Sequence, residues 1–197
     1  MSNRSLQLSF PLPGPGQSSG LGLTDWDSFT AMDKALAGTG FRVRYLRGIF
    51  EIMSISRPHE YLKSLMGSLI ETYCQHVGID YFAWGSATHR IEGVASAEPD
   101  ESYTFGVDAK ETPDLVIEVG LTSGGIDKCA LWSDLGAKEI WIWENDRLHA
   151  FQLEPGRVEP IRQSLCLPAL DLVMIDELVR LQPTSAAVRE LRRRLAA

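Results

Sequence analysis

The chain has 197 residues, a hydrophobic content of 44% and a formal net charge of −7. This composition fits one globular domain with a hydrophobic core, and no apolar stretch approaches the ~18 residues that a membrane helix needs. A negatively charged surface repels polyanions, so any contact with nucleic acid has to be local, transient or assisted by a metal ion. The three cysteines are far apart and lack C-x-x-C spacing, which indicates free thiols in a reducing cytoplasm.

The first elements in the chain are an arm, a helix and a hairpin. Residues 1–22 are rich in proline, glycine and serine and predict a flexible arm ahead of a single domain over 23–197. TDWDSFTAMDKALAG spaces its apolar residues helically after a loose capping box that begins at Thr24. FRVRYL and IFEIMSI flank Arg47-Gly48 and predict a hairpin.

The longest predicted helix runs from Pro58 to about Val77, with proline in its first turn and Gly78 after its end. Two strand-like segments, IDYFAW and SATHRIEG, come next. The segment 94–111 is then expected to be a polar connection, and DLVIEVG after it to be a strand.

The second half of the chain predicts a helix over GIDKCALWSDLG that closes at Gly136, and a hairpin that turns at Asn145-Asp146. Two further helices fill about 168–197, after a core of about 24–153. Strands mixed with helices in this order predict an α/β (α+β) fold.

The strand DLVIEVG carries two carboxylates on one face. Asp114, Val116 and Glu118 share that face, because successive side chains of a strand alternate. One interpretation is a half-buried strand whose polar face meets solvent. The other is a functional site, since Glu118 lies close to the strand end, where open sheets commonly place their sites.

Two neighbours in the sequence favour the functional interpretation. Asp100 lies in a Pro-Asp step suited to a turn or a strand start. Lys128 lies in the first turn of its helix, where the helix dipole disfavours a cation, so it needs an anionic neighbour such as Glu118. Two carboxylates can hold Mg²⁺ or Mn²⁺, and a lysine can orient water or stabilise developing negative charge. The set therefore predicts hydrolysis of a phosphodiester.

These residues also carry a family resemblance. Asp100 in EPD, Glu118 in LVIEVG, and Lys128 resemble the PD-(D/E)xK nuclease pattern. The string PDLVIEVGLTSGGIDKCALWSDLGAKEIWIWENDRLHAF, with RYLRGIFEIMSISRPHEYLKSLMGSLI upstream, resembles the Uma-type endonuclease family, a bacterial domain of unknown function. The resemblance covers about 24–153. It implies a restriction-endonuclease-like core with a central mixed β-sheet flanked by helices and a metal site at one edge.

The chain departs from the usual motif at the lysine. The motif has lysine two residues after the acid, where this sequence has Gly120, and Lys128 instead follows ten residues after Glu118. This resembles the migrated-lysine arrangement of this branch. A helix packed on the strand can bring the amine back to the acid.

Four further residues are weaker candidates. Glu51, His59 and Glu60 occupy places where the family has acidic and histidine residues near the site, although His59 could equally be exposed to water at a helix start. Asp114 lies about two strand steps, ~13 Å, from the site end and is as well explained by a structural or solvent-facing role.

The predicted function is that of a cytoplasmic, metal-dependent endonuclease whose substrate is DNA. The aromatic hairpin EIWIWENDRLHAF further predicts a homodimer. The alternative is a catalytically weak or inactive nuclease-fold module that binds a partner protein or nucleic acid. The acidic charge and the displaced lysine favour this alternative, whereas the joint presence of Asp100, Glu118 and Lys128 favours the enzyme.

Overall fold

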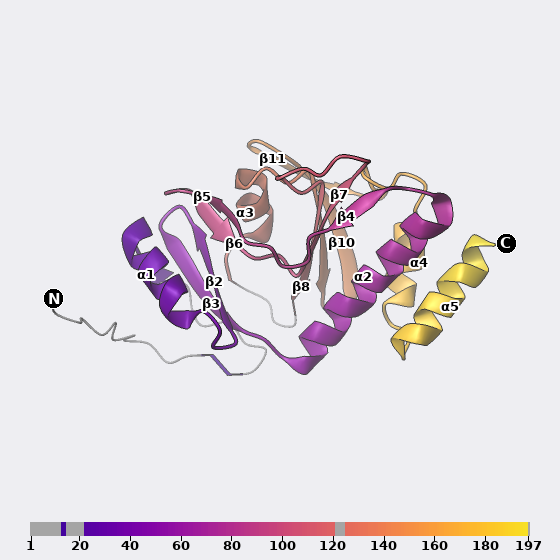
Figure 1. The fold of residues 1–197 in the computed structure, drawn as a ribbon, viewed down its shortest axis with the longest axis horizontal. Helices are drawn as coiled ribbons and strands as arrows, with labels where there is room; N and C mark the ends of the chain where they lie inside the picture. The colour runs from indigo at the N-terminus through magenta and orange to yellow at the C-terminus, as the bar shows by residue number, and fades with distance from the viewer. Residues whose placement is uncertain (1–12, 15–21, 121–124, 197) are drawn as a thin grey trace.

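The computed structural model describes residues 13–14, 22–120 and 125–196. The arm predicted for residues 1–22 lies almost entirely outside the described residues. Figure 1 shows two sheets, with α1 beside one and α2, α4 and α5 beside the other. No helix in the described ranges combines the length and the apolar character needed to cross a membrane.

The first sheet, here called the antiparallel sheet, has the strand order β1-β3-β2-β6-β5. Its strands are β1 (Gly22–Leu23), β3 (Ile49–Ser54), β2 (Phe41–Leu46), β6 (Ala95–Ala97) and β5 (His89–Ile91). The helix α1 (Trp26–Leu36) packs on it through buried apolar side chains. The cap of α1 is Asp25, which accepts a hydrogen bond from the Ser28 amide at 2.8 Å, so the predicted capping box at Thr24 is wrong by one residue.

The β2–β3 hairpin turns where the sequence predicts it. Arg47 and Gly48 both have positive φ, 48° and 90°, as a two-residue hairpin turn requires. Along β2, Val43 and Tyr45 pack under α1 in the core. Arg42 and Arg44 therefore point from the opposite face, toward the second sheet.

The second sheet, here called the mixed sheet, has the order β11-β10-β9-β8-β7-β4. Only β8 and β9 are parallel in it, and α3 (Lys128–Asp134) lies in the crossover between them. Its strands are β11 (Arg157–Ile161), β10 (Arg147–Glu154), β9 (Glu139–Glu144), β8 (Leu115–Gly120), β7 (Glu101–Phe105) and β4 (Tyr81–Ala83).

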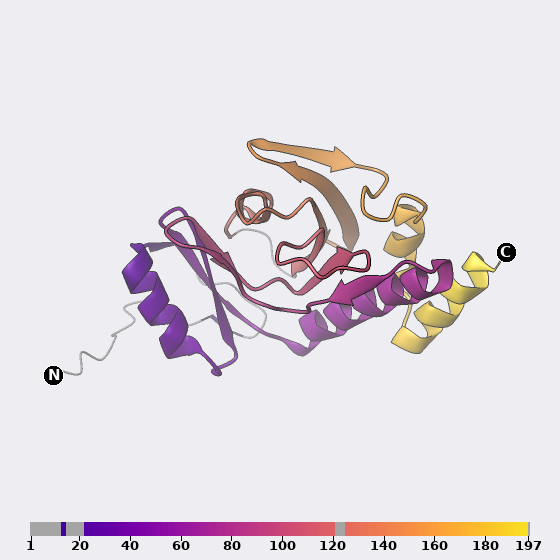
Figure 2. The same ribbon diagram turned by 45° about the horizontal axis from the view of Figure 1, so that its top comes forward.

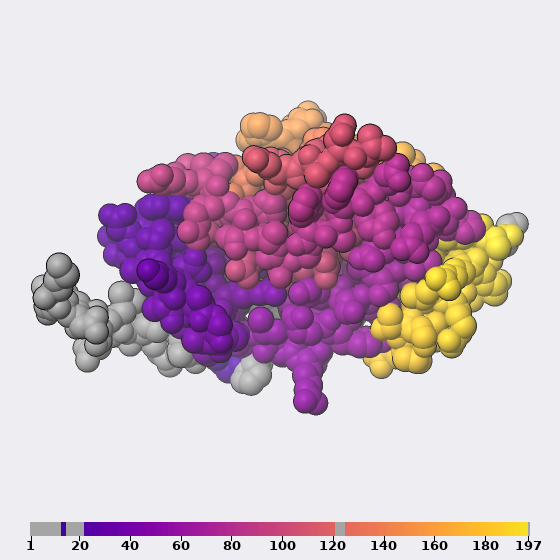
Figure 3. Space-filling model, viewed as in Figure 1, coloured from indigo at the N-terminus to yellow at the C-terminus, as the bar shows by residue number. Residues whose placement is uncertain are grey.

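Three helices cover one face of the mixed sheet: α2 (Arg57–Val77), α4 (Leu172–Leu178) and α5 (Thr184–Leu195). Figure 2 shows α5 alongside α2, and in Figure 3 the surface of α2 runs between α5 and the N-terminal elements. The helix α3 packs with a second core cluster on the other face. The predicted α+β fold, a central mixed β-sheet flanked by helices, is confirmed.

The segment 94–111, predicted to be a polar connection, contains β6 and β7, and β11 was not predicted either. The reason is that β6 consists of alanine and serine, whereas in β7 the alternation of Tyr103 and Phe105 with Ser102 and Thr104 lies within a segment rich in polar residues. Each pairs with a strand next to it in the sequence and with a more distant one: β6 with β5 and β2, and β7 with β8 and β4.

All six residues of β8 are buried, so the interpretation in which its polar face meets solvent is wrong. Leu115, Ile117 and Val119 contact the core under α2, whereas Val116 lies in the cluster with α3. The carboxylate of Glu118 is consequently enclosed on that second side of the mixed sheet.

Candidate active site

Glu118 lies at the centre of the candidate site, fully buried near the end of β8. Its Oε2 accepts a short hydrogen bond from Nη2 of Arg44, and its Oε1 accepts one from the indole nitrogen of Trp132 at 2.8 Å. Arg44 comes from the antiparallel sheet and Trp132 from α3. Side chains from two other elements, β2 and α3, therefore bind the one carboxylate on β8.

Asp100 lies beside Glu118, just before β7. Its Oδ2 accepts a hydrogen bond of 2.7 Å from the backbone amide of Val119, and its Oδ1 accepts one of 3.0 Å from Nη1 of Arg42. Burial raises the pKa of the Asp100 carboxyl, but His59, the charge of Arg44 and the Val119 amide outweigh burial and lower it to about 2. Asp100 is therefore an anion at neutral pH.

His59 contacts Asp100 from the first turn of α2, a helix capped by Ser56. Its Nε2 lies 3.0 Å from Oδ2 of Asp100. Burial lowers the pKa of His59, and the contact with Asp100 outweighs this and raises it. The side chain is buried, so the alternative in which His59 is exposed to water is wrong.

Glu51 faces the same site from β3. It is the direct cross-strand partner of Arg44, and its Oε2 accepts a hydrogen bond of 3.3 Å from the amide of Ile126. Gly125 packs against it so closely that a Cβ at this position would lie 2.3 Å from Oε1 of Glu51. Gly125 also has a φ of 107°, so both its conformation and its surroundings require glycine.

Lys128 reaches Glu118 from the start of α3, where Asp127 caps the helix by accepting from the Ala130 amide. The distance from Nζ of Lys128 to Oε2 of Glu118 is 3.9 Å, so α3 brings the amine close to the acid. A Cβ at Gly120 would lie 3.2 Å from the same Nζ. The amine thus lies beside the position that carries lysine in the usual motif.

The remaining two candidates lie apart from this group. Glu60 is partly exposed and contacts Nδ1 of His59 at 3.4 Å and Nζ of Lys63 at 3.5 Å, which places it at the rim. Asp114 lies at the other end of β8, where its carboxylate pairs with Lys110 at 2.5 Å and Lys138 at 2.7 Å. Of its two predicted alternatives, the structural role fits these contacts.

Asp114 predicts a pH-dependent contribution to stability. Burial raises its pKa, and the two lysines and the Phe105 amide outweigh burial and lower it. Because the pKa of Asp114 is lower in the folded chain than in the unfolded chain, where it is ~3.9, the ionised carboxylate stabilises the fold. This contribution is fully present above the unfolded pKa and is lost as the pH falls through the folded pKa. Asp114→Asn is therefore expected to lower the free energy of unfolding by about 1 kcal/mol at pH 7, since both lysines are partly exposed.

Urea unfolding at pH 7 and at pH 3 measures this difference, which should shrink at the lower pH. Asp108→Asn, a change of an exposed carboxylate in the same connection, is the control and should have no effect. An equal loss of stability at both pH values for Asp114→Asn would contradict the electrostatic explanation.

Three residues of the site were missed or only partly recognised. Arg42 and Arg44 were not predicted, although their alternation with Val43 and Tyr45 in FRVRYL puts both on one strand face. Trp132 was not predicted as a site residue; it is buried, and its indole N–H donates to Glu118. Its spacing of four residues from Lys128 places both on one face of α3, and this signal was available in the sequence.

Glu51, Asp100 and Glu118 all lie near Arg44, and carboxylate oxygens are the ligand type that a hard divalent cation prefers. Over residues 22–120 and 125–196, however, no three His, Cys, Asp or Glu side chains are already grouped as ligands. Asp100 and Glu118 pair with Arg42 and Arg44 instead. A cation would have to share or displace these partners.

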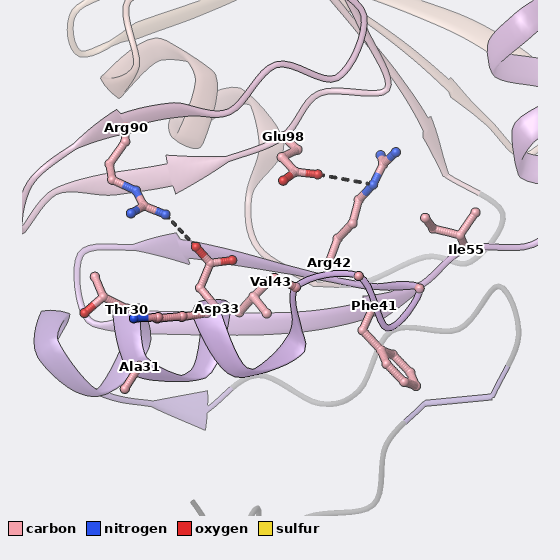
Figure 4. Close-up of a pocket in the computed structure, with 13 residues that line it drawn as sticks. Thr30, Ala31, Asp33, Phe41, Arg42, Val43, Ile55, Arg90 and Glu98 are labelled. Carbon is pink, nitrogen blue, oxygen red and sulfur yellow. Dashed lines mark hydrogen bonds and ion pairs between the residues drawn. The ribbon is translucent and has the colours of Figure 1, made fainter.

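A cavity of about 750 Å³ adjoins the site between α1 and β2. Figure 4 shows two ion pairs along it, Arg42 with Glu98 at 3.6 Å and Arg90 with Asp33 at 2.5 Å. Lys34 also lines the cavity. Arg42 therefore connects the cavity with Asp100.

Comparison with known proteins decides the family. The model of the Uma2 family, described as "Putative restriction endonuclease", matches residues 26–187. The chain belongs to the Uma2 family. The resemblance predicted from the sequence is confirmed, and the match extends past residue 153 through α4 into α5.

One similar solved structure is that of a "putative nuclease belonging to DUF820" from Anabaena variabilis ATCC 29413. It shares 15% sequence identity with this Uma2 chain, at a TM-score of 0.43. The alignment covers 76% of this chain and 90% of that one. A comparison with curated proteins finds no match.

Proposed function

We propose that this Uma2 chain is a metal-dependent endonuclease that hydrolyses phosphodiester bonds in DNA. The family match supports a nuclease, and the convergence of Asp100, Glu118 and Lys128 supports the hydrolytic site. The observation that carries the proposal is the position of the Lys128 amine, 3.9 Å from Glu118 and beside Gly120, where the usual motif has its lysine.

Each residue has a definite task in this proposal. Asp100 and Glu118 would hold Mg²⁺ or Mn²⁺, with Glu51 as a further oxygen donor. The bound ion would lower the pKa of a water molecule and neutralise charge on the phosphodiester. Lys128 orients the attacking water or stabilises the developing negative charge. His59 keeps Asp100 anionic, because it holds the pKa of that carboxyl down.

The adjoining cavity supports a local contact with the DNA backbone. Its lining has three cationic side chains, Lys34, Arg42 and Arg90, and two acidic ones, Asp33 and Glu98, so it is more positive than the chain as a whole, which carries a net charge of −7. Arg42 also bonds Asp100, so a strand that follows these cations leads to the carboxylates. Because this chain would neutralise only a few DNA phosphates, its affinity for DNA should fall only moderately as the salt concentration rises.

Cleavage of supercoiled plasmid and of single-stranded DNA, with Mg²⁺ or Mn²⁺ and with a chelator, tests the proposal. The wild type should cleave only with the metal ion, and Asp100→Asn and Glu118→Gln should each be inactive. Asp114→Asn is the control: it changes the carboxylate at the other end of β8, away from the site, and should stay active. Absence of cleavage by the wild type under all these conditions would refute the proposed endonuclease activity.

Metal binding should also stabilise the fold. An ion that binds only the folded chain raises the free energy of unfolding by about 2.7 kcal/mol at a hundredfold excess over its Kd. Thermal unfolding with and without Mn²⁺ measures this shift. The double variant Asp100→Ala/Glu118→Ala should lose it, and an unchanged shift in that variant would assign the ion to another site.

A binding module without turnover is the second candidate function. The observation that favours it is that arginine side chains neutralise both site carboxylates, Arg42 at Asp100 and Arg44 at Glu118. DNA binding by a chain that never cleaves, measured by fluorescence anisotropy, would support this candidate.

The homodimer stays a prediction. The aromatic residues on which it was based, Trp141 and Trp143, are buried within the core of one chain, so they offer no surface to a partner. A homodimer would have to form through another surface. The molar mass measured by light scattering at micromolar concentration tests whether the chain is a dimer.

A further inference from the structure

Arg44 is a buried cation with few bonds. Its side chain is 1% exposed, and its Nη2 donates to Oε2 of Glu118. Its Nε and Nη1 have no hydrogen-bond partner among the residues that the structure describes. Buried N–H groups are nearly always paired, so a guanidinium with two unpaired nitrogens calls for an explanation.

The surroundings of Arg44 are acidic. Glu51 lies directly opposite in the strand register, and Glu118 and Asp100 come from the mixed sheet. Burial lowers the pKa of Arg44, and the negative charges of these three carboxylates outweigh burial and raise it. Arg44 is therefore held in place more by charge than by a full set of hydrogen bonds.

The same three carboxylates carry the oxygen atoms that a divalent cation prefers, although they are not already grouped as ligands in the described residues. A guanidinium and a divalent ion at one carboxylate oxygen repel each other, and this repulsion is strong where little water screens it. Asp100 has Arg42 as its own cationic partner and also contacts His59. Glu118 has only Arg44 and, at 3.9 Å, Lys128 as cationic partners in the described part of the chain.

We propose that Arg44 is an internal cation that competes with the divalent metal ion for Glu118, so that the ion binds as Arg44 leaves this carboxylate. The inference rests on the proposed function, because it concerns the same site. Arg44 then sets the metal affinity of the chain and offsets one negative charge of the acidic cluster when the metal ion is absent.

The test is the affinity for Mn²⁺, measured by isothermal titration calorimetry. Arg44→Met keeps the apolar stem and removes the charge, and should bind Mn²⁺ at least tenfold more tightly than the wild type. Arg44→Lys retains a cation and should stay within about threefold of the wild type. Arg47→Met is the matched control in the same hairpin, since Arg47 is exposed and pairs with Asp134.

Equal or weaker Mn²⁺ binding by folded Arg44→Met would overturn the inference, because it would make Arg44 a supporting residue of the site. Adding Glu118→Gln to Arg44→Met should remove the gain in affinity. A gain that persists in this double variant would also overturn the inference, since the ion would then not depend on Glu118.

A second measurement uses the wild type, in case Arg44→Met does not fold. The Nε–Hε NMR signal of Arg44 should shift on titration with Mg²⁺, while that of Arg47 stays in place. The signal is assigned by its loss in Arg44→Lys. An Arg44 signal that is unchanged at saturating Mg²⁺ contradicts the displacement.

Failure of this inference differs from failure of the proposed function. Metal-dependent cleavage by the wild type, with no gain in Mn²⁺ affinity for Arg44→Met, overturns the role of Arg44 alone. A gain in affinity in a chain that never cleaves DNA supports Arg44 and refutes the nuclease. No metal binding by either the wild type or Arg44→Met overturns both.

Discussion

Lys128→Ala is expected to lower kcat for DNA cleavage by about 10²–10³-fold, or ~2.7–4 kcal/mol of transition-state stabilisation. The side chain is 18% exposed and its Nζ lies 3.9 Å from Glu118, so it adds charge to the site and little to the core. The free energy of unfolding should therefore change by less than about 1 kcal/mol. Steady-state cleavage of plasmid DNA and urea unfolding measure the two quantities.

Two further variants sharpen this prediction. Lys128→Met keeps the stem but deletes the charge, and should be as inactive as alanine. Lys138→Met removes an exposed lysine that pairs with Asp114 beyond the other end of β8, and should cleave like the wild type. Unchanged cleavage by Lys128→Ala would remove Lys128 from the mechanism. In that case its removal should slightly stabilise α3, by ~0.3–1 kcal/mol, because a cation in the first turn opposes the helix dipole.

Glu139→Ala should cause the largest loss of stability, about 3 kcal/mol. The carboxylate is fully buried at the start of β9 and accepts hydrogen bonds from the Trp141 indole at 2.5 Å and from the amides of Leu165 and Cys166 at 2.8 and 3.0 Å. Alanine leaves three donors without this acceptor, at a cost of ~1–3 kcal/mol for each donor that stays buried. A loss of this size lowers Tm by about 6–12 °C in a chain of this length.

Calorimetry or circular dichroism on heating gives the Tm, and Glu139→Gln should lose less because it keeps one acceptor oxygen. Glu154→Ala is the surface control, and its effect should stay within about 0.5 kcal/mol. A Tm of Glu139→Ala equal to that of the wild type would show that water or another acceptor replaces the carboxylate.

The sequence predicts those parts of the fold that local signals specify. The helix α2 has its proline in the first turn and Gly78 at its end, with a φ of 73°. The turns at Arg47-Gly48 and Asn145-Asp146 have the positive φ values that their hairpins need. The strand β6 could not be predicted, because its alanines and serine show no apolar alternation, whereas the alternation of Tyr103 and Phe105 with Ser102 and Thr104 in β7 was a signal available in the sequence.

The site residues, too, divide into those that local sequence order brings together and those that only the packing of the two sheets brings together. Glu118 and Lys128 lie on a strand and on the next helix, so their approach follows from local order, and the motif added Asp100. Arg44 comes from another sheet, and arginine is rarely buried unless it is paired, so a single sequence gives no reason to place it inside. The contact between Arg44 and Glu118 depends on how the two sheets pack.

The position of the lysine on α3 also affects how the site can vary. A lysine on β8 would be fixed relative to Glu118 by the hydrogen-bond ladder of the sheet. Lys128 instead depends on the packing of a helix, which the bond from Trp132 to Glu118 ties to the strand. Substitutions under α3 can therefore change the distance from amine to carboxylate, and with it the rate, in relatives whose acids and lysine are unaltered.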